Sequence, residues 1–131
     1  MRKLILIASL FIATNVVAQE PWVAPKEANA MKSPFSLEDE KMIAKGEKLF
    51  GKICWTCHGE MGEGDGVAAE QLDPKPADLS SHAVQAQSDG SFYWKITNGR
   101  GAMTSYEAMF SDNQRWQLVA FIRSLAKEEA E

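Results

Sequence analysis

Residues 54–58 (CWTCH) constrain this chain more than any other segment. Cys54 and Cys57 are the only cysteines in the sequence, and His58, one of two histidines, follows them directly. This C-x-x-C-H spacing is typical of covalent c-type haem attachment, because each thiol can add to one vinyl group and the next imidazole can bind the iron. We therefore expect a fold built around one covalently bound haem c, held by Cys54, Cys57 and His58.

Three other chemistries use paired cysteines, and the surrounding sequence favours none of them. A thioredoxin-like redox pair follows an apolar strand, whereas a charged segment with a helical pattern precedes Cys54. A structural zinc site needs four ligands, and only Cys54, Cys57, His58 and His82 are available. A disulfide between Cys54 and Cys57 would close a very small ring and stabilise little.

The N-terminus predicts export. Residues 1–3 (MRK) are positively charged, residues 4–13 (LILIASLFIA) are apolar, and residues 16–18 (VVA) precede the expected cleavage after Ala18. The apolar stretch is shorter than the ~20 residues of a membrane-spanning helix. We therefore expect a signal peptide over residues 1–18, a periplasmic location, and no transmembrane segment in the mature chain.

The charge balance argues against a nucleic-acid partner. The whole chain has a formal net charge of −4, and cleavage of the signal peptide would remove two basic residues. Surfaces that bind nucleic acid are basic, so the acidic mature chain is expected to bind none.

The rest of the chain predicts one small all-α domain. Residues 19–35 contain three prolines and show neither helical nor strand periodicity, so we expect an extended N-terminal arm. Residues 36–127 are expected to form the domain, and residues 128–131 (EEAE) are expected to fray.

An amphipathic helix is predicted at each end of this domain. The first is expected to begin after Ser36, with Asp39 completing an approximate capping box, and to run toward Cys54. The last is expected to begin after Ser111, with Gln114 completing a second capping box.

The apolar faces of these two helices predict a crossing contact. Small Gly46 and Phe50 lie on one face of the first helix, and Trp116 and Phe121 lie on the apolar face of the last. We expect these four residues to meet. The basic residues of the last helix are expected outside its apolar face, and they are Arg115, Arg123 and Lys127.

The segments between the two helices are expected to be mostly irregular. Four glycines within residues 59–66 (GEMGEGDG) predict a solvated turn. Prolines stiffen residues 72–79 (LDPKPADL) in an extended conformation. A short helix is expected over residues 90–97, before a turn at residues 98–101.

Four residues are candidates for the iron ligand opposite His58. Met61 is only three residues away, and Met109 precedes the cap of the last helix, where packing is its expected role. Met103 follows a glycine-rich turn that allows close approach of the backbone. We predict Met103, with His82 or an open or water-ligated iron as the alternatives.

The chain resembles the class I c-type cytochromes. The resemblance covers nearly all of residues 36–125, and the matching positions are Gly46, Phe50, residues 54–59 (CWTCHG), Gly62, Gly64, Asp65, Gly66, Pro76, Asn98, Gly99, Met103 and Trp116. It implies an all-α fold of three to five helices around the haem, with His58 and Met103 as axial ligands. It also implies a proline carbonyl that accepts from the second nitrogen of His58. Pro76 is the expected residue and Pro74 the alternative, while Thr104 stands where the family often has proline.

The resemblance implies a one-electron carrier rather than an enzyme. Its partners would be periplasmic or membrane redox proteins that meet it transiently. One alternative is a haem subunit or relay of a larger oxidoreductase, docked to a membrane or dehydrogenase complex through the arm. The other is a haem enzyme or gas sensor with an open iron site.

Overall fold

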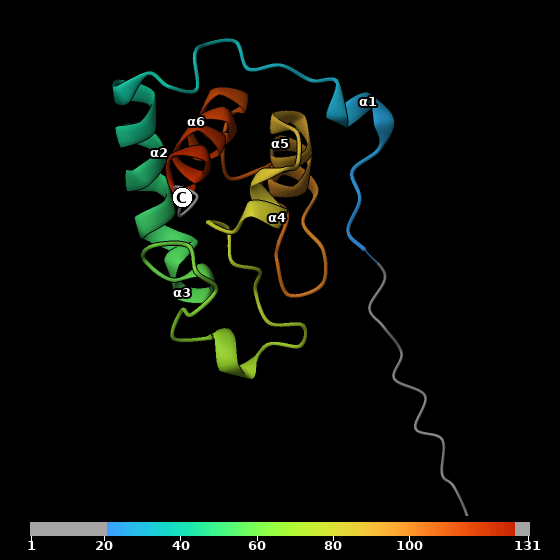
Figure 1. Cartoon of the computed structure of the whole chain (residues 1–131), viewed down its shortest axis with the longest axis vertical. Helices are drawn as coiled ribbons and strands as arrows, with labels where there is room; N and C mark the ends of the chain where they lie inside the picture. Colours follow the sequence, from blue (N-terminus) through green and yellow to red (C-terminus); the bar gives the residue numbers. More distant parts are fainter. Residues whose placement is uncertain (1–20, 128–131) are drawn as a thin grey trace, which may run out of the picture.

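The computed structural model describes residues 21–127, and all of its regular elements are helical (Figure 1). The predicted signal peptide over residues 1–18 and the predicted frayed tail over residues 128–131 lie outside the described residues. Three of the helices are single turns of four residues, so the described part of the chain has more than the three to five expected. In order the elements are α1 (Lys26–Asn29), α2 (Glu40–Ile53), α3 (Trp55–His58), the 3₁₀ turn η1 (Ala69–Gln71), α4 (His82–Gln85), α5 (Asp89–Asn98) and α6 (Asp112–Ser124).

Helix α2 begins later than the sequence predicts. Its cap is Asp39, whose carboxylate accepts hydrogen bonds from the backbone N–H groups of Lys41 at 2.8 Å and Met42 at 3.3 Å. Ser36 instead opens the preceding turn, in which its carbonyl accepts from the N–H of Asp39 at 3.2 Å. The expected start after Ser36 is therefore wrong by one turn, because Asp39 rather than Ser36 accepts from the free N–H groups at the start of α2.

Helix α6 begins as predicted. The Ser111 hydroxyl accepts from the N–H of Gln114 at 3.4 Å, and the Gln114 side chain accepts from the N–H of Ser111 at 2.9 Å. Both halves of the capping box are present, so two otherwise unpaired N–H groups are satisfied.

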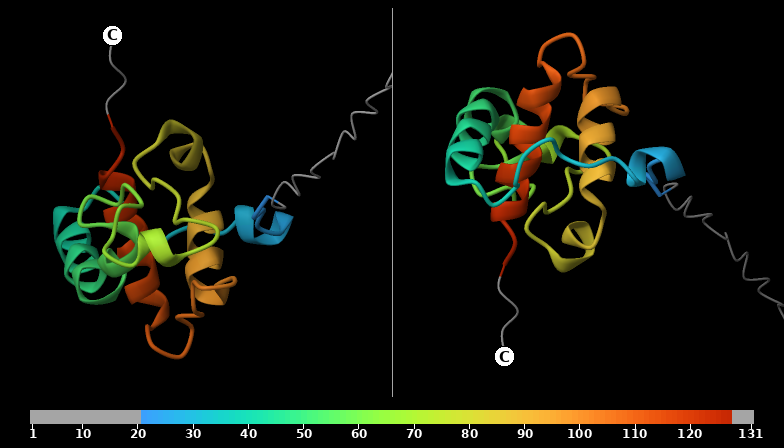
Figure 2. Two further views of the ribbon diagram at one scale, coloured as in Figure 1. Left: turned by 90° about the horizontal axis from the view of Figure 1, so that it is seen from below. Right: turned by 90° about the horizontal axis from the view of Figure 1, so that it is seen from above.

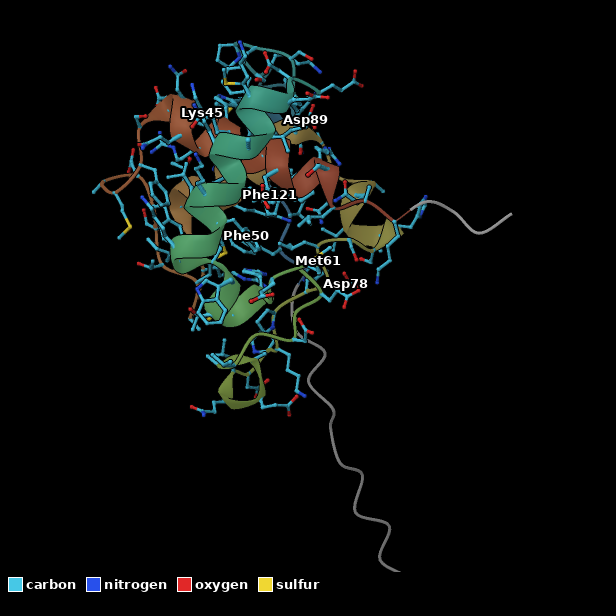
Figure 3. The ribbon with its side chains drawn as sticks, turned by 90° about the vertical axis from the view of Figure 1, so that its left-hand side faces the viewer. Lys45, Phe50, Met61, Asp78, Asp89 and Phe121 are labelled. Atoms are coloured by element: carbon cyan, nitrogen blue, oxygen red, sulfur yellow. The ribbon has the colours of Figure 1, made fainter. Side chains whose placement is uncertain are left out.

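Helices α2 and α6 cross in close contact, as expected (Figure 3). A Cβ atom placed on Gly46 would lie 1.9 Å from the backbone oxygen of Gln117, and the rings of Phe50 and Phe121 lie 5.0 Å apart. The expected role of Trp116 in this contact is not the one observed. Trp116 stacks on Tyr93 of α5 at 4.4 Å, so it joins α6 to α5.

The helices lie side by side in the order α2, α6, α5, α1, as both views of Figure 2 show. Helix α6 is therefore the central element, and it is buried on both sides by its neighbours. It supplies five of the eleven core residues, more than any other element; the core residues are Phe50, Phe92, Tyr93, Ile96, Tyr106, Phe110, Trp116, Leu118, Val119, Phe121 and Ile122.

The N-terminal arm contains one helical turn, α1, and packs on α5. A Cβ on Gly90 would lie 1.9 Å from the carbonyl oxygen of Ala28, and the Ser88 hydroxyl donates to Asn29 at 2.9 Å. The Trp22 ring lies near Lys95 and Arg100, at 5.3 Å and 5.0 Å from its centre. The sequence does not predict α1, because four residues form a stable helix only when packing supports them.

Candidate functional site

The cysteine–histidine segment forms a single helical turn directly after α2. The N–H of Cys54 donates to Phe50 at 2.9 Å, and the N–H of His58 donates to Cys54 at 2.9 Å, so the helical direction continues through α3. Residues three and four positions apart lie on the same side of a helix. This turn therefore places Cys54, Cys57 and His58 together, with both thiols free and half-buried.

The His58 ring is held in its neutral form. Burial lowers its pKa, and a backbone contact at Ala77 opposes this only in part. Its Nδ1 atom is buried and has no hydrogen-bond partner. A neutral imidazole has a free lone pair for a metal.

The backbone beside the His58 ring belongs to Ala77 rather than to the expected Pro76 or Pro74. The Pro76 carbonyl instead lies against Gly64, where a Cβ atom would be 2.4 Å from its oxygen. The proline expectation is therefore shifted by one residue in this structure. An acceptor beside the second ring nitrogen orients a ligating histidine and raises its donor strength.

The glycine-rich loop is solvated at its side chains, as the sequence predicts, because Glu60, Met61, Glu63 and Asp65 are exposed, but its glycines pack against the cysteine–histidine turn. The N–H of Gly64 donates to His58 at 2.8 Å, and the N–H of Gly66 donates to Cys57 at 3.1 Å. A Cβ on Gly66 would lie 2.3 Å from the oxygen of Thr56. The loop thus satisfies the carbonyls at the end of α3, and its glycines allow the close approach.

Among the candidates for the second axial ligand, Met103 is the one that packs against the core. Its side chain is half-buried at the edge of the same core cluster that Cys54 borders. Met61 and Met109 are 65% and 56% exposed, and His82 is exposed at the start of α4.

Met103 and Cys54 pack against the same core cluster, and Tyr106, three residues after Met103, is a buried member of it. Burial raises the pKa of Tyr106, and the charges of Cys54 and Cys57 add to this effect. The described structure thus brings the Met103 segment and the cysteine–histidine turn to one core cluster.

Met103 lies in a tight turn that closes on itself. The N–H of Arg100 donates to the Met103 carbonyl at 2.8 Å, and the N–H of Met103 donates to the Arg100 carbonyl at 3.1 Å. Gly99 and Gly101 flank Arg100 with φ angles of +65° and +58°, which glycine adopts without strain. The turn therefore depends on these two glycines.

Replacement of Gly99 by alanine is expected to displace the Met103 turn. The new Cβ would lie 2.4 Å from the Met103 carbonyl oxygen, so the free energy of unfolding should fall by about 3 kcal/mol or more. Gly101→Ala is the matched control, because its φ is also positive but no atom lies within 4 Å of a new Cβ. It should lose only about 1–2 kcal/mol. Equal losses in denaturant titrations of the two variants would contradict the close approach at Gly99.

Arg115 is a residue that sequence reasoning misplaced. It was expected outside the apolar face of the last helix, but it is 5% exposed and lies within the core side of α6. Its guanidinium donates to the carbonyls of Glu107 and Phe110 at 3.1 Å and 3.0 Å. Its position in the sequence could have indicated this burial, because residue 115 lies three and four positions before the buried Leu118 and Val119 and so shares their face of the helix.

The competing chemistries find no support at this site. Burial and the neighbouring Cys57 raise the pKa of Cys54 to about 11, whereas cysteines that exchange disulfides have lowered pKa values. Within residues 21–127, no three His, Cys, Asp or Glu side chains gather as zinc ligands would. Two free thiols one turn apart, a neutral imidazole after them and a thioether that packs against the same core cluster do fit a covalently held haem.

The family model described as "Cytochrome C oxidase, cbb3-type, subunit III" matches residues 41–122. A solved chain of the reducing HAO-like protein complex of Kuenenia stuttgartiensis is similar, with a TM-score of 0.65 and 30% identity over 72% of this chain and 48% of that chain. Cytochrome CL of the marine methylotrophic bacterium Methylophaga aminisulfidivorans is similar in fold, with a TM-score of 0.58 and 20% identity over 89% of this chain and 74% of that chain. No curated protein matches significantly.

This chain thus spans about half the length of the Kuenenia chain. Among the helices of residues 21–127, none combines the length and apolar character needed to cross a membrane.

Proposed function

We propose that this chain, which belongs to the family described as cytochrome C oxidase, cbb3-type, subunit III, carries single electrons between redox proteins through one covalently bound haem c. The observation that carries the proposal is the turn of α3, which presents two free thiols together with a half-buried imidazole whose pKa is lowered by burial. The resemblance to class I c-type cytochromes and the all-α fold are confirmed by the family match and by the similarity to cytochrome CL.

The residues of the site have distinct roles in this proposal. Haem supplies an iron that changes between the ferric and ferrous states by one electron. Cys54 and Cys57 would hold the group covalently as thioethers, and His58 would donate a nitrogen lone pair to its iron. Met103 would supply a soft, neutral thioether as the second protein ligand. An iron held by two protein ligands would leave no site for a substrate, so we propose an electron carrier rather than an enzyme.

The same residues favour the reduced state. A Met/His ligand pair raises the reduction potential relative to a harder second ligand. Burial disfavours the additional positive charge of the ferric form. We propose that Phe50, Leu72, Leu79, Trp94 and Ile96 form an apolar shell around the haem; Phe50 and Ile96 are buried, and the other three are half-buried.

Location and partners complete the proposal. The predicted signal peptide supports export to the periplasm, where the partners would be redox proteins met transiently at small interfaces. The alternative, a subunit of a larger oxidoreductase, is favoured by the similarity to a chain of the HAO-like complex. Size-exclusion chromatography of the native protein distinguishes the two, because a stable complex that co-purifies would exclude a free carrier.

Acid–organic extraction tests the proposal directly. Haem should remain with the exported wild-type polypeptide after extraction, and the intact mass should exceed that of the bare polypeptide by one haem. Cys54→Ser with Cys57→Ser should release the haem into the organic phase, because no thioether remains. A wild-type protein that shows only the bare polypeptide mass would contradict the proposal.

A further inference from the structure

We infer that Arg115 is a positioning residue that holds the Met103 segment in place for the iron. The inference rests on the proposed ligation by Met103. The side chain of Arg115 is almost fully buried in α6, yet it is charged. Its Nη1 atom donates to two backbone carbonyls of the segment between α5 and α6, those of Glu107 at 3.1 Å and Phe110 at 3.0 Å.

The other half of the guanidinium is anchored on α5 and on the start of α6. Nη2 donates to the Tyr93 hydroxyl at 2.9 Å and pairs with the carboxylate of Asp112. The guanidinium also lies over the Tyr93 ring at 5.2 Å from its centre. A planar fork of donors bound on both sides is rigid, so Arg115 joins two helices to the intervening loop.

The carbonyls that Arg115 binds belong to a compact turn. The Tyr106 carbonyl accepts from the N–H of Met109 at 3.2 Å and from the N–H of Phe110 at 3.0 Å. The N–H of Tyr106 donates to the Ile96 carbonyl at 3.1 Å, which ties the turn to α5. Residues 106–110 therefore move as one unit, and Arg115 fixes that unit to α6.

The clamped turn is connected to the site at its first residue. Tyr106 belongs to the core cluster against which Cys54 and Met103 pack, and it is three residues from Met103. Loss of the Arg115 hydrogen bonds would loosen residues 107–110, which are part of the loop between α5 and α6 in Figure 1, and would leave the hydrogen bond of Tyr106 to Ile96 to hold the segment. Binding of Met103 to the iron would then cost more conformational entropy. An added ligand would therefore displace Met103 from the iron more easily.

Helix α6 contains a matched control in Arg123. Its guanidinium also binds two backbone carbonyls, those of Gln85 and Gln87, and pairs with Asp89 at 2.6 Å. It lies over the Phe92 ring at 4.6 Å, as Arg115 lies over Tyr93. Arg123 thus holds a different loop, which contains none of the proposed ligands.

Imidazole titration of the ferric, haem-loaded full chain tests the inference. Arg115→Gln should bind imidazole at least about tenfold more tightly than wild type, which equals about 1.4 kcal/mol. Arg115→Lys retains the charge but loses the fork, so its affinity should lie between the two. Arg123→Gln should remain within about twofold of wild type, and unfolding titrations of all variants would report their global stability.

Two outcomes overturn the inference. If Arg115→Gln and Arg123→Gln gain equally in affinity for imidazole, general destabilisation of the protein makes the iron accessible, and the specific role of Arg115 is excluded. If Arg115→Lys and Arg115→Gln both bind imidazole with the wild-type affinity, Arg115 does not position Met103. If Arg115→Gln does not fold, the affinity of Arg115→Lys alone decides. If Met103→Ala binds imidazole no more tightly than wild type, the ligand assignment itself fails, which the arginine variants do not test.

Discussion

Met103→Ala should open the iron to added ligands and lower the reduction potential. The alanine side chain cannot bind iron, so water or a weaker, harder ligand would take the position of the thioether, and the ferrous state would lose its preference. The expected fall in potential is on the order of 0.2 V, within the ~0.8 V range that axial ligands span. Redox titration measures the fall, and carbon monoxide should bind the reduced variant at neutral pH but not the reduced wild type.

The other methionines provide controls for this substitution. Met61→Ala and Met109→Ala remove exposed thioethers, so their spectra and potentials should match those of wild type. His82→Ala tests the alternative ligand in the same assay. An unchanged spectrum for Met103→Ala would contradict the assignment, and carbon monoxide binding to His82→Ala alone would assign the position to His82.

The cysteine–histidine part of the site could be predicted from the sequence because it is local. Cys54, Cys57 and His58 are within one helical turn, so their spacing alone places them together. Met103 is 45 positions after His58 in the sequence, and only its glycine-rich turn indicated it. The burial of Arg115 follows from its helical position, but its partners could not be predicted, because the carbonyls of Glu107 and Phe110 would be provided by any residue type.

The fold shows the same division between local and distant causes. The capping box of α6 and the short helix α5 follow from side chains close in sequence, and both are found where the sequence predicts them. Helices α1 and α4 are single turns that depend on distant contacts. For α4, the Gln85 side chain donates to the Ile122 carbonyl of α6 at 2.8 Å, a partner that no local pattern indicates.

Gly46→Ala should destabilise the protein because it pushes α2 and α6 apart. The new Cβ would lie 1.9 Å from the backbone oxygen of Gln117 and 2.9 Å from the Cβ of Phe121. Neither contact is the flexible end of a side chain, so the helices themselves must shift. The expected loss in the free energy of unfolding is about 3 kcal/mol, measured by denaturant titration of the haem-loaded protein.

Gly51→Ala in the same helix should have the opposite effect. Gly51 is exposed, and no atom lies within 4 Å of an added Cβ. The only effect should be the better helix propensity of alanine, which stabilises by roughly 0.5–1 kcal/mol. Because the same substitution is made twice in one helix, the opposite signs isolate the close crossing of α2 and α6 from any general effect on α2. Two variants that change stability in the same direction would contradict this crossing, and with it the packing that supports the turn of Cys54, Cys57 and His58.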